Sequence, residues 1–288
     1  MGALVAALPR VRIAVVISAI LASASARAEG LETEALLHPL DGFTAYTLKQ
    51  GELVYCQSPL TLPLPSWAWV GVTDWLTAEV DLLPLIGGFF VEPHRPVPSF
   101  NFRFRLRDGG VRGISLALET MWQHLWLPTT QEDSPHVRVE RDGSQVWARL
   151  NVSIPVTPAF RIHASAGATY AHSFEVTDND PEMPRGRRYI DKVSPDASLA
   201  LDYRFRPWMS WHATASMGVT FVYSDNQPRK LEAGYGMRIA PFLHSSYGIL
   251  SNLRAELAAF VTHHPASGTG YFLPVPIFPY LYWQWNND

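Results

Sequence analysis

Charged side chains recur at every second position along several stretches of this chain. The clearest example is Phe100–Arg107, in which Arg103, Arg105 and Arg107 alternate with apolar residues. Because successive side chains of a β-strand point to opposite faces, these arginines are predicted to share one face. A row of cations on one face of a strand attracts anions or lines a path for small solutes. The spacing therefore points to solute binding or passage.

The same spacing predicts a larger set of charges that face one common interior. Its members are Glu79, Asp81, Arg103, Arg105, Arg107, Glu119, Arg149, Arg161, Asp202, Arg204, Glu232, Arg238, Arg254 and Glu256. Two interpretations stay open. Either the interior binds or passes small solutes with a mild preference for anions, or the charges pair with one another and fill a narrow lumen, since buried charges require partners. The three arginines of one strand favour the first, because they cannot all be paired locally.

A second candidate for chemistry is the pair His163 and Ser165, which offers a base and a nucleophile. The His-x-Ser spacing resembles outer-membrane phospholipase A, a β-barrel enzyme whose Ser and His share one strand face. The rest of that family's motif is missing here. His163 also follows a predicted corner at the periplasmic end and faces the interior, whereas the family's nucleophile faces lipid near the outer leaflet. We therefore predict no catalytic residues, with a lipid-active enzyme as the last alternative.

No metal or cofactor site is predicted. The neighbours His263 and His264 lie on a predicted strand, where adjacent side chains point to opposite faces and cannot easily bind one ion. Glycine-rich phosphate loops, Cys/His metal spacings and nucleophile elbows are missing from the sequence. The only cysteine, Cys56, excludes an intramolecular disulfide.

The elements that would position the charges are long two-faced strands. From Ala197 to Phe205, and again from Met209 to Tyr223, the odd positions are apolar or aromatic and most even positions are polar. The corner Arg206–Trp208 joins these two arms. Arms of about 9 and 15 residues exceed the usual 5 or 6 of a soluble strand. They are typical of a transmembrane β-barrel, whose strands need about 9–11 residues and alternate lipid-facing with lumen-facing side chains.

Alternation along the whole chain predicts an all-β fold, an up-and-down antiparallel barrel of about 12 strands. The predicted strands are Glu52–Ser58, Trp67–Thr73, Leu76–Leu82, Phe100–Arg107, Ile114–Glu119, Val146–Ile154, Phe160–Thr169, Ala197–Phe205, Met209–Tyr223, Leu231–Ile239, Asn252–Val261 and Tyr271–Trp285. The count becomes about 14 if Val137–Gly143 spans the membrane and Phe43–Leu48 is also a strand. Otherwise Val137–Gly143 is an extracellular extension.

The connections are predicted from Pro, Gly and polar content. Leu83–Ser99 and Glu175–Ser194 are expected to be long loops, and His244–Gly248 a short turn. Pro274 and Pro276 fit poorly in a closed barrel, because each lacks a backbone donor and a closed barrel has no free edge. We expect both prolines to lie above the membrane.

The first 28 residues are predicted to be a signal peptide, with a basic start, an apolar stretch and an Ala-Arg-Ala cleavage site ahead of Glu29. Residues 29–288 then form the barrel domain in the outer membrane. The chain has 47% hydrophobic and 17% charged residues and a net charge of −3 without a basic run, so nucleic acid is not an expected partner.

Two short stretches carry a resemblance. An Ala-Tyr-Thr-Leu with a Lys-x-Gly-Glu after it, within Gly42–Glu52, and the Gly-Val-Thr-Asp of Gly71–Asp74 resemble uncharacterised outer-membrane β-barrel proteins of Gram-negative bacteria. The resemblance implies an outer-membrane barrel and brings no activity or functional residues with it.

The sequence thus predicts an outer-membrane barrel without an enzymatic role, either a passive narrow pore or a membrane anchor. The alternative from another class is a structural or assembly subunit of an envelope complex, recognised through its extracellular loops. The expected partners are outer-membrane lipid and either small solutes or envelope proteins.

Overall fold

The computed structural model describes residues 44–57, 66–87, 89, 98–110, 112–130, 138–178, 186–218, 231–264 and 268–285. The predicted signal peptide, residues 1–28, lies outside the described residues. Within the part of the chain that the structure describes, no helix is long and apolar enough to cross a membrane.

The chain forms a closed antiparallel β-barrel of 12 strands, in which each strand pairs with its neighbours in sequence and β1 pairs with β12. The strands are β1 (Leu53–Gln57), β2 (Trp67–Thr73), β3 (Leu76–Asp81), β4 (Ser99–Arg107), β5 (Ser115–Thr130), β6 (Arg138–Thr157), β7 (Phe160–Asp178), β8 (Gly186–Arg206), β9 (Met209–Met217), β10 (Leu231–Ile239), β11 (Leu253–His264) and β12 (Gly268–Trp285). Among the described residues, two short helices, α3 (Leu82–Gly87) and α4 (Gly248–Ser251), lie in the connections. The predicted fold class and the count of 12 are confirmed.

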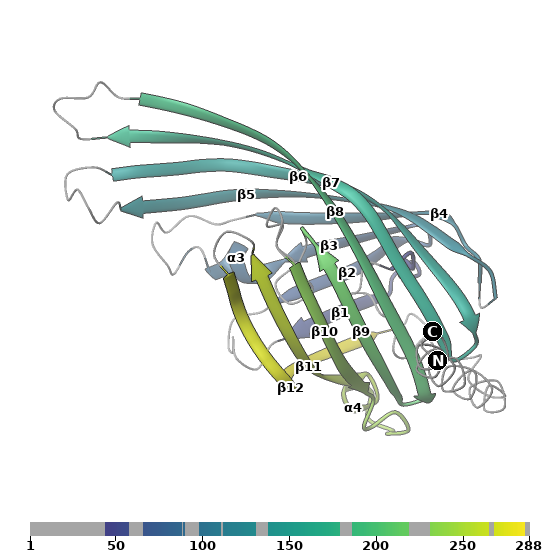
Figure 1. The fold of residues 1–288 in the computed structure, drawn as a ribbon. Helices are drawn as coiled ribbons and strands as arrows, with labels where there is room; N and C mark the ends of the chain where they lie inside the picture. The colour runs from purple at the N-terminus through teal and green to yellow at the C-terminus, as the bar shows by residue number, and fades with distance from the viewer. Residues whose placement is uncertain are drawn as a thin grey trace, which may run out of the picture.

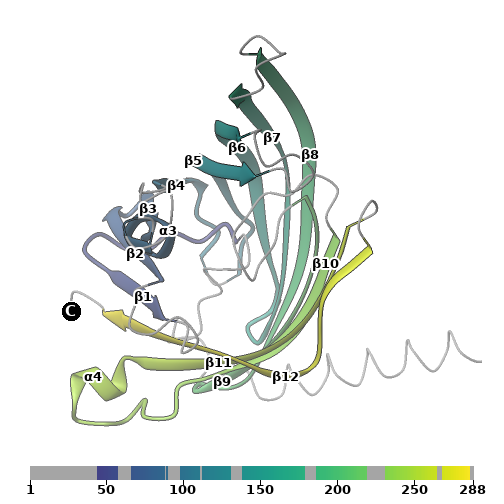
Figure 2. The same ribbon diagram turned by 90° about the vertical axis from the view of Figure 1, so that its left-hand side faces the viewer.

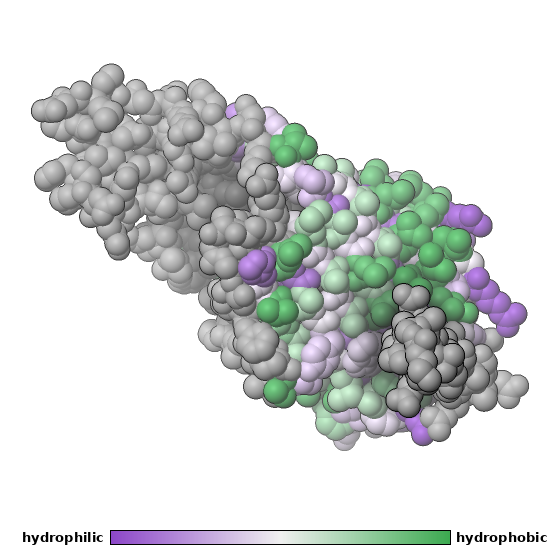
Figure 3. Space-filling model, in the orientation of Figure 1, coloured by the Kyte–Doolittle hydropathy of each residue, from purple (hydrophilic) through white to green (hydrophobic). Residues whose placement is uncertain are grey.

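Alternation along each strand separates an apolar outer face from a polar inner face. In β6, Val146 and Leu150 are exposed on the outside while Trp147, Arg149 and Asn151 are buried. Figure 3 shows hydrophobic residues spread over the outer face of the strands, with strongly hydrophilic ones mostly towards its edges. Polar and charged side chains make up most of the fully buried residues, which is the reverse of a soluble protein.

The barrel is much taller on one side than on the other. Strands β5 to β8 are 16, 20, 19 and 21 residues long, whereas β1, β2 and β3 have 5, 7 and 6. Figures 1 and 2 show β5 to β8 projecting far beyond the other strands at one end. At the opposite end, tight turns join β2 to β3, β6 to β7 and β8 to β9, and both β1 and β12 reach it. We call this the turn end.

The chain closes on itself through a short seam. Five residue pairs, from Leu53↔Trp285 to Gln57↔Leu281, join β1 to β12. Above this seam β12 bulges: Ala258 of β11 faces Phe278 while Phe260 faces Leu273. The residues between Leu273 and Phe278, which include both prolines, thus fall in an irregular part of β12 above its pairing with β1. The donors that Pro274 and Pro276 lack therefore cost no ladder bond, whereas Pro279 stays in the ladder opposite Leu257.

Several predicted boundaries change. Val139 and Gly143 continue β6 as an extension of the β5–β6 pair, and the alternative of 14 strands is not what the structure shows. The predicted loop Glu175–Ser194 is wrong at both ends, because Glu175 pairs with Arg188 in the ladder between β7 and β8. The composition of this stretch is largely polar and includes prolines, so its sequence lacks the apolar alternation that identified the other strands.

The hairpin of β8 and β9 also differs from its predicted shape. Its first arm is longer than expected, since β8 begins at Gly186, and β9 ends at Met217, followed by Gly218 with φ +82°. The rest of the predicted second arm lies outside the described residues. The connection between β10 and β11 is not a tight turn at His244–Gly248, because it continues into α4. The predicted loop after Leu82 begins with α3.

Candidate functional site

Residues Thr44–Gln50, which precede β1, run inside the barrel near the turn end; we call them the lumen segment. The amide N–H of Leu48 donates to Thr77 Oγ1 of β3 at 2.8 Å, and the amide N–H of Ala45 donates to Ser153 Oγ of β6, also at 2.8 Å. Thr44 and Ala45 have no exposed surface and Leu48 only 2%. The segment therefore crosses the lumen from β3 to β6.

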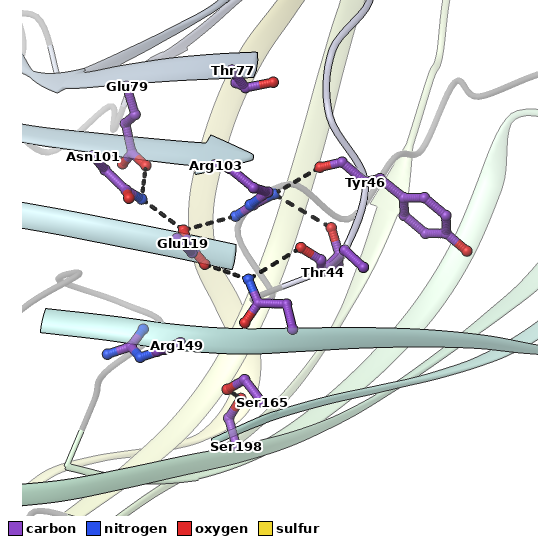
Figure 4. Close-up of polar contacts among 12 residues, drawn as sticks. Thr44, Tyr46, Thr77, Glu79, Asn101, Arg103, Glu119, Arg149, Ser165 and Ser198 are labelled. Atoms are coloured by element: carbon purple, nitrogen blue, oxygen red, sulfur yellow. Dashed lines mark hydrogen bonds and ion pairs between the residues drawn. The ribbon is translucent and has the colours of Figure 1, made fainter. Parts of the chain in front are cut away.

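Arg103 connects the lumen segment to the barrel wall. Its Nη1 donates to the carbonyl oxygen of Tyr46 at 3.2 Å, and its Nη2 pairs with Glu119 Oε1 at 3.0 Å. Asn151 Nδ2 donates to the same carboxylate, through Oε2 at 2.5 Å, and also to the carbonyl oxygen of Thr44 at 3.3 Å. Figure 4 shows this network with Glu119 at its centre. Buried charge-assisted bonds of this kind are the strong ones, so the network holds the segment and the wall in one arrangement.

The lumen segment leads into β1 through a close contact with β2. The amide of Gly51, whose φ is +81°, donates to the carbonyl of Gly71 at 2.8 Å, and the amide of Gly71 donates to the carbonyl of Glu52 at 2.9 Å. A Cβ on Gly71 would lie 1.8 Å from the Lys49 carbonyl oxygen, so no side chain fits there. Asp74 Oδ1 accepts from the amide of Gln50 at 3.0 Å. The two stretches that carry the sequence resemblance thus contact each other directly.

An aromatic and aliphatic patch supports the other side of the segment. Leu48 packs with Val54, Cys56 and Trp69, and Trp67, Tyr280 and Tyr282 pack against this cluster. Cys56 is buried and forms no disulfide. The lumen therefore has an apolar wall on β12, β1 and β2.

Charged pairs line the remaining wall. Arg149 Nε lies 2.7 Å from Asp196 Oδ1, and the Arg149 guanidinium lies 3.7 Å from the ring centre of Trp147. Glu256 accepts from Arg238 Nε at 2.6 Å and lies 3.2 Å from His212 Nε2. Each of these pairs joins neighbouring or nearby strands, so these charges compensate one another locally, as buried charges must.

The structure brings most of the predicted lumen charges to the inside. Those buried there are Arg103, Glu119, Arg149, Asp202, Arg204, Glu232, Arg238, Arg254 and Glu256. Arg161 is half-buried, with its guanidinium 5.4 Å from the Tyr46 ring centre. Arg254 donates to the carbonyl oxygens of Ser251 and Leu253, at 2.6 and 3.0 Å.

The three arginines of β4 do not form the shared cationic row that their spacing predicts. Arg103 pairs with Glu119, Arg105 pairs with Asp108 at 2.9 Å near the rim, and Arg107 is exposed. A shift in register between Arg105 and Arg107 breaks the alternation at this point. This bulge turns Arg107 away from the lumen. Its position depends on the register between β4 and β5, so the alternation within β4 alone cannot indicate it.

The His-x-Ser pair is not joined in the structure. His163 Nδ1 lies 2.8 Å from Ser153 Oγ, while Ser165 Oγ lies 2.5 Å from Ser198 Oγ. The two side chains that carry the resemblance to a lipid-active enzyme therefore have different partners. His263 is exposed at the end of β11, and no group of three metal-ligating side chains occurs among the described residues.

Sequence analysis alone does not identify the lumen segment or the polar groups that bind it. Thr77, Asn151 and Ser153 lie on the inner faces of their strands. Their position in the alternation could have identified them as lumen-facing. Nothing in their spacing indicates that their partner is a segment more than a hundred positions away from Asn151.

Comparisons with known proteins find similar folds without a family. No family model matches the chain, and no curated protein matches it. Among solved structures, it is similar to the translocator domain of the autotransporter NalP from Neisseria meningitidis, with 10% identity, a TM-score of 0.40 and 95% of each chain covered. It is also similar to the toluene transporter TodX from Pseudomonas putida, with 9% identity, a TM-score of 0.37, and 85% of this chain and 81% of that chain covered. The toluene transporter TbuX from Ralstonia pickettii has 10% identity and a TM-score of 0.32, with 87% and 92% covered.

Removing Arg103 is expected to destabilise the barrel strongly. Arg103→Met leaves the buried Glu119 carboxylate without its cation and should cost about 3–5 kcal/mol of unfolding free energy. Combining it with Glu119→Gln should restore part of this loss, because no uncompensated charge remains. Urea unfolding of the four variants of this cycle in detergent measures both effects. Additive losses would contradict a direct pair.

Gly71→Ala is expected to displace the lumen segment while the barrel still forms. Its Cβ overlaps the Lys49 carbonyl oxygen, a clash that should disfavour the docked segment by about 1–3 kcal/mol. In a Cys56→Ser background, an Ala45→Cys thiol should then react with a maleimide about tenfold faster or more. Gly248→Ala is the matched control, because nothing lies within 4 Å of that Cβ position. Equal rates for the two glycine variants would contradict the contact.

Proposed function

We propose that this chain is an integral outer-membrane β-barrel that forms a narrow, passive pore, closed at its turn end by the lumen segment. One observation carries the proposal: a closed barrel turns its charged side chains inward and its large apolar side chains outward. Lipid cannot solvate charges, and every backbone group of a spanning segment must be paired, so a closed barrel with this polarity suits a membrane.

Aromatic residues support a membrane orientation. Trp75, Trp208 and Phe242 are exposed near the turn end, where interfacial aromatic residues are typical of membrane barrels. Short turns and both chain ends are usual on the periplasmic side. The turn end is therefore assigned to the periplasm and the long ends of β5 to β8 to the cell exterior.

The distribution of side chains supports a narrow path. The wall of β4 to β6 is filled by the lumen segment and by ion pairs such as Arg103–Glu119, whose side chains are only 6% and 1% exposed. Among the inward residues of β8 to β10, Ser198, Thr214 and Gly234 are small and half-buried, whereas Arg204, His212 and Arg238 are large and buried. We assign the path that opens when the lumen segment leaves its site to this side of the lumen.

A second candidate function rests on the projecting strands. Pairing of β8 with β9 begins at Ala197, so β8 from Gly186 to Asp196 pairs with β7 beyond the height of β9. Figure 1 shows β5 to β8 continuing together past the rest of the barrel. An external sheet of this kind favours a structural or assembly subunit that is recognised from outside. A barrel that conducts no ions and co-purifies with envelope proteins would support this role over the pore.

Arginine on the outer face should be far more costly than arginine on the inner face. Ala215 is exposed on the outside of β9, and its neighbour Thr214 faces the lumen. In lipid vesicles Ala215→Arg should cost about 2–4 kcal/mol of unfolding free energy, and Thr214→Arg much less. Denaturant titration of the folded barrel in vesicles measures both. Equal losses would contradict a membrane-facing outer surface.

Conductance tests the pore. In planar bilayers the chain without residues 29–48 should show stepwise openings, because the lumen segment no longer crosses the bore. The chain that retains these residues should be silent or open rarely. Heat-modifiable migration on gels, checked for both proteins, establishes that each barrel is folded. A folded, shortened barrel without openings would overturn the pore.

A further inference from the structure

The barrel wall holds the lumen segment mainly by its backbone. Side chains of the wall bond the amides of Ala45 and Leu48 and the carbonyl oxygens of Thr44 and Tyr46. The groups that do this are Ser153, Thr77, Asn151 and Arg103. Backbone amides and carbonyls occur in every peptide, so such contacts recognise an extended chain rather than one particular residue.

Side-chain contacts add a simple preference. Ala45 is fully enclosed and Leu48 packs into the patch of Val54, Cys56 and Trp69. The Tyr46 ring meets His163 edge to face, with 5.8 Å between ring centres. Lys49 and Gln50 are exposed. The wall therefore fits a small residue, then an aromatic one, and an aliphatic one two positions later.

We propose that the inner wall of β3, β4, β6 and β7 is a binding site for an extended peptide, and that Thr44–Leu48 occupies it in cis. The occupied site crosses the lumen, so the bound peptide closes the pore; this consequence rests on the proposed function. The peptide site itself depends only on the contacts with the wall. Gly51, with its positive φ, is the joint at which the occupant leaves the lumen while β1 keeps its place in the seam.

A peptide added in trans tests the site. The probe is a synthetic peptide with the sequence of residues 42–50, GFTAYTLKQ, given to the chain without residues 29–48. It should bind saturably, as measured by fluorescence anisotropy of a labelled copy, and should block the bilayer current. A peptide with Ala45→Arg and Leu48→Asp is the control, because the enclosed Ala45 site has no room for arginine and the apolar patch disfavours a carboxylate. It should neither bind nor block.

Variants of the wall separate a specific site from general adhesion. Ser153→Val removes the acceptor of the Ala45 amide and should weaken peptide binding about tenfold. Ser198→Ala is the matched control: its hydroxyl bonds Ser165, away from the lumen segment, and its loss should leave binding unchanged. Equal affinity for the wild-type and control peptides would overturn the proposal, as would no binding to a folded barrel.

The outcomes distinguish the two proposals. If the shortened barrel conducts but the peptide neither binds nor blocks, the peptide site is wrong and the pore stands. If the folded, shortened barrel is silent but binds the peptide, the pore is wrong and the site stands. Should the shortened chain not fold, the full chain with Ala45→Arg and Leu48→Asp replaces it, since these changes exclude the segment from the site.

Discussion

Closure of the barrel is the constraint on which the other features depend. A sheet with open edges leaves backbone donors and acceptors unpaired, which lipid does not tolerate. The seam of Leu53–Gln57 with Leu281–Trp285 removes these edges at the turn end. Once the wall is closed, side chains can point only inward or outward, so the period of two along each strand divides polar from apolar. The charged pairs and the lumen segment share the enclosed inner side.

Much of this organisation can be predicted from alternation, because each strand contacts two unlike environments. Leu231–Ile239 and Trp67–Thr73 match their predicted bounds. The alternation no longer identifies a strand where the two faces of the strand have similar environments. Glu175 and Arg188 pair in strands that continue beyond the barrel, where both faces can be polar and sequence composition resembles a loop. Bulges have a similar effect: a single register shift removes Arg107 from the face that its spacing indicates.

The candidate site was less accessible to sequence analysis for a different reason. The position of a charged residue along its strand predicts that it faces the lumen. Its partner, however, depends on the register between strands. Asp196, for example, pairs with Arg149, which lies two strands away. The lumen segment has no periodicity and a single charged residue, Lys49, and its contacts join residues 107 and 108 positions apart. In the sequence, only the short motifs within Gly42–Glu52 and Gly71–Asp74 mark the stretches that meet there.

The short link at Gly51 limits how the lumen segment can leave its site. Only Gly51 and Glu52 separate the lumen segment from β1, so a displaced segment stays within about 30 Å of its site. A ligand tethered so closely has an effective concentration in the millimolar range. A free peptide of the same intrinsic affinity therefore cannot compete with it at micromolar concentration. Opening would require a force along the chain or a cut in the tether, and a severed segment would dissociate by simple dilution.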